Sequence, residues 1–331
     1  MTAMAAAVAA FIITAVAGKP LAGWLDKKGL SRTEFEKHGE GFSPGIRAVP
    51  EFGGLLFLLA MIPVGILVLT AVLLLETDEA FSIRAEAGKM LAVVVCTALI
   101  GTVGLMDDWR RAKRLGTMPP LLRLVMVFVI SFAFLVGVRL SGDRSSILLL
   151  PFAGGQLDAG QGWTIIMLVM LIGAALGGDR MRAVSGQSAS VSLVCALGCG
   201  GVFAVFSRMG ACSLAFAGAG ALLGMMLSVF PPERMREGSG GAMAGSVLPV
   251  MAAIAGGAPL FILPAMIPFL FEGIYAIINV ALQAAGRQTS SPSLGDWLIG
   301  RGLSRKMVTG IYALLSLAGS IAAVMGGYFY L

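Results

Sequence analysis

Ten apolar stretches, each long enough to cross a lipid bilayer as a helix, dominate this 331-residue sequence. A hydrocarbon core about 30 Å thick requires roughly 20 predominantly apolar residues in a helix. A hydropathy window of about 19 residues places the spans at 3–22, 51–75, 89–106, 120–139, 162–178, 187–206, 209–230, 242–257, 258–281 and 307–329. Charged residues make up 13% of the chain, against roughly 25% in soluble domains. The sequence therefore predicts an all-α integral membrane protein with a single polytopic domain over residues 1–331.

Lysine and arginine are unevenly divided between alternate connections. The odd-numbered connections hold 17 of the 24 Lys and Arg residues, and they are 24–50, 107–119, 179–186, 231–241 and 282–306. Loops rich in these residues stay on the cytoplasmic side, so we expect these five to be cytoplasmic and both termini to lie outside. The N-terminal run lacks a preceding positive segment and is expected to be a first span. The net charge of +6 is explained by the basic residues of these loops. The sequence has no basic segment interleaved with aromatic residues, so it does not indicate a nucleic-acid partner.

The segment near 145–160 is too short to span as a helix. It consists of a short apolar run, the Gly154-Gly155 turn and a second short run. This pattern is typical of a β-hairpin. With both termini outside, the hairpin is expected on the periplasmic face.

Two adjacent carboxylates, Asp107 and Asp108, end the apolar run Met90–Met106, and the basic residues Arg110 and Arg111 follow them. Abutting carboxylates repel each other unless they share a cation. The pair therefore indicates a Mg²⁺ site, a phosphate-bearing ligand held through a metal, or a fixed ion pair with nearby arginines. Alternatively, these residues form no functional site, and the charges of both signs only mark a helix end exposed to water.

The other candidate polar residues are expected at the same cytoplasmic face. They comprise Asp179, the loop Glu237–Gly241 and the stretch Ser290–Ser304. Glu272 lies within an apolar span, and Asn279 follows it two helical turns later on the same face. We expect these two to be structural polar residues in the membrane. A transporter would hide more charge near mid-membrane and show an internal repeat, so this class is disfavoured.

Several motifs occur in an order that resembles one membrane-protein family. They are Pro50-Glu51-Phe52-Gly53-Gly54, Gly104-Leu105-Met106-Asp107-Asp108, Leu149-Leu150-Pro151-Phe152, Gly218–Pro232 followed by Gly238-Ser239-Gly240-Gly241, then Glu272, Asn279, Gly286-Arg287 and Gly302-Leu303-Ser304-Arg305. In this order the chain resembles the polyprenyl-phosphate phosphoglycosyltransferases, the MraY/WecA group of glycosyltransferase family 4 type. The resemblance covers most of the chain.

The resemblance implies a ten-span protein of the bacterial cytoplasmic (inner) membrane. Members transfer a sugar phosphate from a UDP-sugar to a lipid phosphate, with Mg²⁺ neutralising the donor diphosphate. By resemblance, Asp107, Asp108 and Asp179 are the retained catalytic carboxylates, and Asp107 and Asp108 would hold the metal. The family also implies a homodimer, or a complex with another membrane protein.

This sequence departs from the family pattern where the chemistry is concentrated. Arg180, Arg182 and Ala183 replace glycines and an aspartate after Asp179, and two asparagines before it become Gly173 and Leu176. Gly238 stands at the usual metal-ligand aspartate, and Ser293-Leu294-Gly295-Asp296 replaces a histidine cluster. The single histidine, His38, lies in another loop. A guanidinium can neutralise phosphate but cannot hold a metal.

We therefore expect a pseudoenzyme with an incomplete catalytic set. It would bind polyprenyl phosphate or another anionic lipid, or scaffold a partner complex, with Mg²⁺ not required. The bound headgroup would meet four arginines, namely Arg110, Arg111, Arg180 and Arg182. The alternative is an active Mg²⁺-dependent transferase of cell-wall or surface-polysaccharide lipid intermediates, in which Glu237 substitutes for the missing ligand. Such an enzyme would release UMP from a UDP-N-acetylhexosamine or UDP-MurNAc-pentapeptide.

Overall fold

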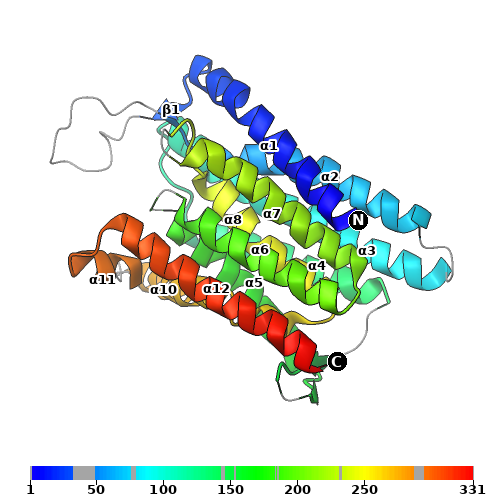
Figure 1. Cartoon of the computed structure of the whole chain (residues 1–331). Helices are drawn as coiled ribbons and strands as arrows, with labels where there is room; N and C mark the ends of the chain where they lie inside the picture. The colour runs from blue at the N-terminus through cyan, green and yellow to red at the C-terminus, as the bar shows by residue number, and fades with distance from the viewer. Residues whose placement is uncertain are drawn as a thin grey trace.

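The computed structural model of the chain is an all-α bundle, shown in Figure 1. It describes residues 2–32, 49–75, 80–142, 146–152, 154–182, 184, 186–230, 233–286 and 294–330, with backbone alone at 75 and 80–83. Within these residues, ten helices are long and apolar enough to cross a membrane, as the sequence predicted. The protein is therefore a multi-pass membrane protein. His38, Ala183, Arg287 and Ser293 lie outside the described residues.

The ten long helices are connected by short elements. The long helices are α1 (Thr2–Lys27), α2 (Gly53–Leu75), α3 (Ala80–Ala112), α4 (Pro120–Leu140), α5 (Gly162–Met181), α6 (Gln187–Val205), α7 (Met209–Val229), α8 (Gly238–Ala255), α10 (Ile267–Ala284) and α12 (Arg305–Tyr330). The short helices are α9 (Pro259–Ile262) and α11 (Leu294–Gly300). The strands are β1 (Ser31–Arg32), β2 (Val49–Pro50), β3 (Ile147–Leu149) and β4 (Gln156–Asp158).

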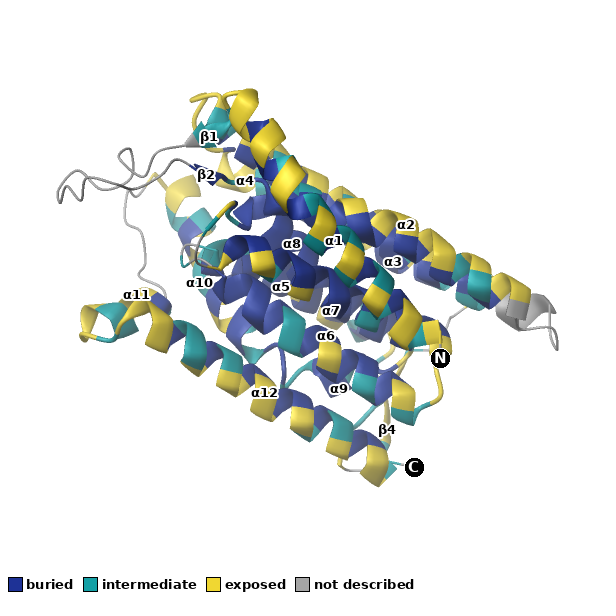
Figure 2. Cartoon of the chain, turned by 45° about the horizontal axis from the view of Figure 1, so that its top comes forward, coloured by how far each residue is buried: buried dark blue, intermediate teal, exposed yellow. Residues whose placement is uncertain are grey.

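Helix α8 forms the centre of the bundle. All 18 of its residues are buried, and Figure 2 shows it enclosed by the surrounding helices. It packs against α2, α3, α5, α6 and α7. Its sequence is dominated by Gly, Ala, Ser and Met, and small residues allow close helix packing in a membrane. The least hydropathic of the ten helices is thus buried among the other helices.

The predicted hairpin is present, with β3 and β4 paired antiparallel from Ile147–Asp158 to Leu149–Gln156. Figure 1 shows the start of α1, the end of α12 and this hairpin at one end of the bundle. The Gln156 Nε2 amide donates to the Tyr330 hydroxyl at 3.3 Å, which ties the hairpin to α12. The opposite end carries β1, α11 and the start of α8. Assignment of these ends to membrane sides remains a prediction.

Several helices extend past their predicted boundaries. Helix α3 continues to Ala112, so Asp107 and Asp108 belong to the helix and not to the loop 107–119. Likewise α5 includes Asp179, and α8 begins at Gly238. Charged residues at these ends have partners within the bundle, so their polarity does not mark a loop.

The region predicted as spans 242–257 and 258–281 is divided differently. Helix α8 ends at Ala255, α9 is one turn, and α10 begins only at Ile267. Gly257 has a φ of +81°, and Pro259 and Pro268 each lie in the first turn of the helix that follows. Proline has no backbone N–H to donate, so it is tolerated at helix starts. A second unpredicted feature is the β1–β2 ribbon, which pairs Ser31 with Pro50 and Arg32 with Val49.

Candidate functional site

The last two turns of α3 lie against the first turn of α8 because glycines remove the side chains between them. A Cβ added to Gly104 of α3 would lie 2.5 Å from the Gly240 nitrogen. A Cβ on Gly54 of α2 would lie 2.4 Å from the Gly241 nitrogen. Such backbone-to-backbone approach is possible only with glycine at the crossing. This close approach places the carboxylates of α3 at the N-terminus of α8.

Asp108 caps the N-terminus of α8. Its Oδ1 accepts from the Ser239 N–H at 2.8 Å, and its Oδ2 accepts from the Gly240 N–H at 2.9 Å. The guanidinium of Arg111 donates to the same carboxylate. Free N–H groups and the helix dipole favour an anion at such a terminus. A carboxylate of the chain itself already fills this anion position.

Asp107 is completely buried and is also surrounded by donors. Its Oδ1 accepts from the Met118 N–H at 2.6 Å. Its Oδ2 lies 3.0 Å from Arg111 Nη2 and 2.7 Å from Arg123 Nη2. Of the arrangements that the sequence left open for this carboxylate pair, the structure has the fixed ion pair with arginines.

Asp179, at the end of α5, continues this network. It accepts from Arg123 on α4 and from the Ser239 hydroxyl on α8. Arg182 Nε donates to Asp179 Oδ1 at 2.8 Å. Burial alone would lower the pKa of Arg182, but the carboxylates of Asp179 and Asp108 outweigh it and hold this pKa above its usual value. Three carboxylates (Asp107, Asp108, Asp179) thus face three guanidinium groups (Arg111, Arg123, Arg182).

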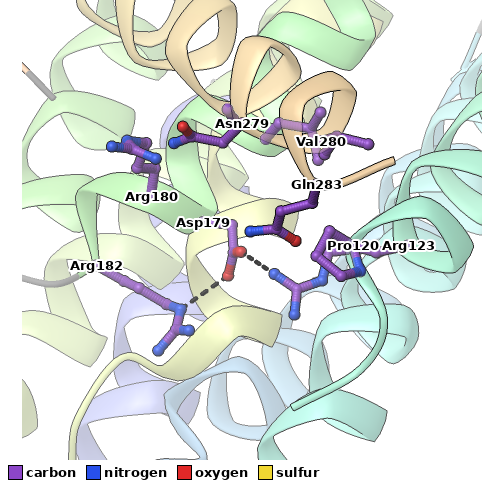
Figure 3. A pocket seen from close by; sticks show the side chains of 10 residues that line it. Pro120, Arg123, Asp179, Arg180, Arg182, Asn279, Val280 and Gln283 are labelled. Atoms are coloured by element: carbon purple, nitrogen blue, oxygen red, sulfur yellow. Dashed lines mark hydrogen bonds and ion pairs between the residues drawn. The ribbon is translucent and has the colours of Figure 1, made fainter. Parts of the chain in front are cut away.

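A cavity of about 340 Å³ opens beside this network, between α4, α5 and α10. Figure 3 shows Asp179 between Arg123 and Arg182, with the Gln283 side chain of α10 pointing toward them. The polar lining consists of arginines, amides and one carboxylate, namely Arg123, Arg180, Arg182, Asn279, Gln283 and Asp179. The apolar lining consists of Pro120, Leu176, Ala276 and Val280. The cavity is therefore positively charged and has an apolar wall.

Glu272 holds α10, α11 and α12 together near this cavity. Its Oε1 accepts from the Tyr312 hydroxyl at 2.5 Å and from the Gly295 N–H at 3.3 Å. Its Oε2 lies 3.4 Å from Arg180 Nε, and Asp296 lies 3.9 Å from the same guanidinium. The partners of Glu272 thus come from α5, α11 and α12, whereas Asn279 lines the cavity.

Glu237 lies at the start of α8 and is buried, with 3% of its surface exposed. Its Oε2 accepts from the Ala189 N–H at 3.1 Å, at the start of α6. Burial raises the pKa of Glu237 to about 8, although this hydrogen bond favours the charged form. At neutral pH the side chain is mostly protonated, and a metal ligand must be deprotonated.

Glu237→Gln is expected to flatten the dependence of stability on pH. An unfolded Glu titrates near 4.5 and the folded one near 8, so the folded protein retains a proton that the unfolded chain releases. The resulting stability is fully present below pH 4.5 and is lost as the pH rises toward 8. The loss is on the order of 5 kcal/mol at most. Thermal unfolding in detergent from pH 5 to 8 should show the variant matching wild type at pH 5 and exceeding it at pH 8.

The matched control for this measurement is Glu233→Gln. Its side chain, in the same segment, is 29% exposed and pairs with Arg236. We expect the pH slope of this variant to follow wild type. An unchanged slope in Glu237→Gln would show that Glu237 does not hold a proton in the folded state.

The structure gathers most, but not all, of the residues predicted from the sequence. Asp107, Asp108 and Asp179 form one network with Arg111 and Arg182, and Arg180 lines the adjoining cavity. Of the four arginines expected to meet a headgroup, Arg110 and Arg111 do not line the cavity. The Nη2 of Arg110 donates to the Leu115 carbonyl at 3.5 Å.

Arg123 bridges Asp107 and Asp179 and was not among the site residues predicted from the sequence. Its signal was an arginine one turn into the predicted span 120–139, whose other charged residue, Arg139, stands at the far end. Ionisable residues within membrane spans are functional candidates by default. Gln283 was missed as well, and nothing local in the sequence distinguishes it. Ser239 lay within the predicted loop Glu237–Gly241, but the sequence assigned it no partner.

Comparison with known proteins does not supply a family. No model of a known protein family matches the chain, and no curated protein matches it.

Proposed function

We propose that this protein is a degenerate relative of the polyprenyl-phosphate phosphoglycosyltransferases that binds a lipid phosphate without a metal. It would reside in the bacterial cytoplasmic membrane and would not transfer sugar phosphate. The observation that carries the proposal is the pairing of the three aspartates with three arginines beside a cationic cavity.

The residues present do not fit the Mg²⁺ ion that the resemblance implies. Mg²⁺ requires near-octahedral oxygen ligands from carboxylates, substrate phosphates and water. Here Asp107 Oδ1 and the oxygens of Asp108 and Asp179 already accept hydrogen bonds. The remaining oxygen, Asp107 Oδ2, is ion-paired with Arg111 and Arg123. A cation beside them would meet positive charges at close range.

The missing ligand also has no room to be restored. Gly238 has a φ of +71°, and a Cβ there would lie 2.5 Å from the Glu51 carbonyl oxygen and 2.6 Å from Asp108 Oδ2. The carboxyl group that the sequence offered as a substitute, Glu237, is mostly protonated at neutral pH because it is buried. These two features argue against a rearranged metal site.

The cavity is better matched to a phosphate group. Guanidinium groups bind phosphate oxygens through paired hydrogen bonds, and Arg123, Arg180 and Arg182 line it together with two amide side chains. The apolar lining, which includes Leu176 and Val280, would accommodate the first carbons of a lipid chain. In this proposal the site binds the headgroup and orients it.

The proposal predicts lipid-phosphate binding without catalysis. Purified protein in detergent should bind undecaprenyl phosphate equally well with Mg²⁺ and with EDTA, as measured by native mass spectrometry. It should release no UMP from UDP-N-acetylhexosamines or the UDP-MurNAc-pentapeptide. UMP release that disappears in Asp108→Asn would instead establish an active transferase. Failure to bind undecaprenyl phosphate in either condition would overturn the binding role.

Arg180→Gln is expected to weaken undecaprenyl phosphate binding about tenfold or more, because one charge-assisted hydrogen bond is lost. Glu272 keeps its hydrogen bonds from Tyr312 and Gly295 in this variant, so the fold should be retained. Arg110→Gln is the matched control, since Arg110 was a sequence candidate but does not line the cavity. Its affinity should remain within about twofold of wild type. Equal losses in both variants would mean that surface charge, and not the cavity, binds the headgroup.

A further inference from the structure

One side chain in the cavity carries the same kind of charge as the proposed ligand. Asp179 lines the cavity, and its carboxylate accepts from Arg123, from Arg182 and from the Ser239 hydroxyl. Its side chain is 11% exposed. Two of the three guanidinium groups that line the cavity are therefore already engaged by a carboxylate on its wall.

An anion entering the cavity cannot simply add to this arrangement. Two negative charges in contact at a protein surface repel each other strongly. A phosphate that binds Arg123 or Arg182 must therefore replace Asp179 there. Arg123 would still face Asp107, whose Oδ2 lies 2.7 Å from its Nη2. Arg182 loses its hydrogen-bonded carboxylate, and the negative charges of Asp108 and Glu51 remain in its surroundings.

We infer that Asp179 is a tethered competitor for the anion site, so that ligand binding is an exchange of one anion for another on Arg123 and Arg182. This inference rests on the proposed function, because it concerns the same cavity. Asp179 is held in place from the third side by Ser239 of α8. Asp179 is therefore fixed in the cavity wall by the packing of α5 against α8.

The exchange has a consequence for ligand class. A carboxylate carries one negative charge, whereas a phosphate monoester carries about 1.5 to 2 at pH 7. A phosphate diester carries one charge and gains little by displacing Asp179. The site should therefore accept phosphomonoesters and exclude phosphodiester headgroups. This would separate its ligand from the diester lipids that surround it.

The test compares two lipids with the same acyl chains, dioleoyl phosphatidic acid (a monoester) and dioleoyl phosphatidylglycerol (a diester). Wild-type protein should bind phosphatidic acid at least about tenfold more tightly, since one additional charge-assisted contact is worth this ratio. Asp179→Asn should bind both lipids more tightly, because neither headgroup then has a carboxylate to displace. Inorganic phosphate serves as a third probe, because a gain in its affinity would show that the headgroup alone senses Asp179.

Ser239→Ala keeps the experiment decisive if Asp179→Asn does not fold. Loss of the hydroxyl loosens Asp179 without removing its charge, so the affinity for phosphatidic acid should rise about two- to fivefold. Asp158→Asn, on the hairpin at the other end of the bundle, is the control and should change neither affinity.

The outcomes separate the two proposals. If wild type binds phosphatidic acid and neither Asp179→Asn nor Ser239→Ala binds it more tightly, the tethered competitor is refuted and the binding function stands. If wild type already binds the two lipids equally, the monoester selectivity is refuted. If neither wild type nor Asp179→Asn binds any of the phosphate probes, the proposed function and this inference fall together.

Discussion

Arg111→Met is expected to destabilise the protein by about 3–5 kcal/mol, the usual cost of leaving buried charges without their partner. Arg111 is 5% exposed, and its Nη2 lies between the carboxylates of Asp107 and Asp108, which are 0% and 1% exposed. Methionine fills a similar volume but supplies no donor. The adjacent carboxylates of Asp107 and Asp108 would then repel each other. Asp107 would keep its ion pair with Arg123. Thermal unfolding in detergent micelles measures the loss.

Arg110→Met is the matched control for this variant, because Arg110 is the preceding residue on α3 but is only partly buried. Its melting temperature should stay within a few degrees of wild type. The double variant Asp108→Asn/Arg111→Met should recover part of the loss, since one of the two stranded charges is removed. A melting temperature for Arg111→Met equal to that of the control would show that the ion pairs do not stabilise this end of the bundle.

Gly238→Asp, which would restore the aspartate expected from the family pattern, is expected to prevent folding or to cost at least about 3 kcal/mol. The added Cβ would lie 2.5 Å from the Glu51 carbonyl oxygen and 2.6 Å from Asp108 Oδ2, in a backbone with φ of +71°. The new carboxylate would also approach Asp108, whose hydrogen bonds to Ser239 and Gly240 hold the start of α8. We expect a low yield of monodisperse protein and no binding of Mn²⁺ as a probe for Mg²⁺.

Gly286→Asp is the control that separates the effect of steric conflict on stability from the effect of backbone conformation. Gly286 has a similar φ of +74°, but a Cβ there meets nothing within 4 Å. This control should fold with a loss of about 1 kcal/mol, the cost of a left-handed conformation in a residue other than glycine. A Gly238→Asp protein that folds like the control and binds Mn²⁺ would mean that the metal site is one residue from complete, contrary to the proposed function.

The resemblance and the structure bear on the candidate site in different ways. Motif order in the sequence pointed to Asp107, Asp108 and Asp179 together, and the structure joins them in one network with arginines. Motif order could not indicate that Arg123, 16 residues after Asp107 in the sequence, bridges Asp107 and Asp179. The pairing of a charged side chain is decided by which helices cross, and no local pattern in the chain records this.

The sequence by itself determined the membrane character, the ten long apolar helices and the short hairpin near 145–160. Hydropathy is a local property that adds up along about 20 residues, so a window over the sequence is sufficient to detect each span. The tertiary structure alone decided that the carboxylates are neutralised by Arg111, Arg123 and Arg182. Those partners come from α3, α4 and the end of α5, and they meet where Gly104 and Gly54 allow α3 and α2 to approach α8 at backbone distance. Electrostatic pairing falls off steeply with distance, so it depends on these crossings and cannot be read along the chain.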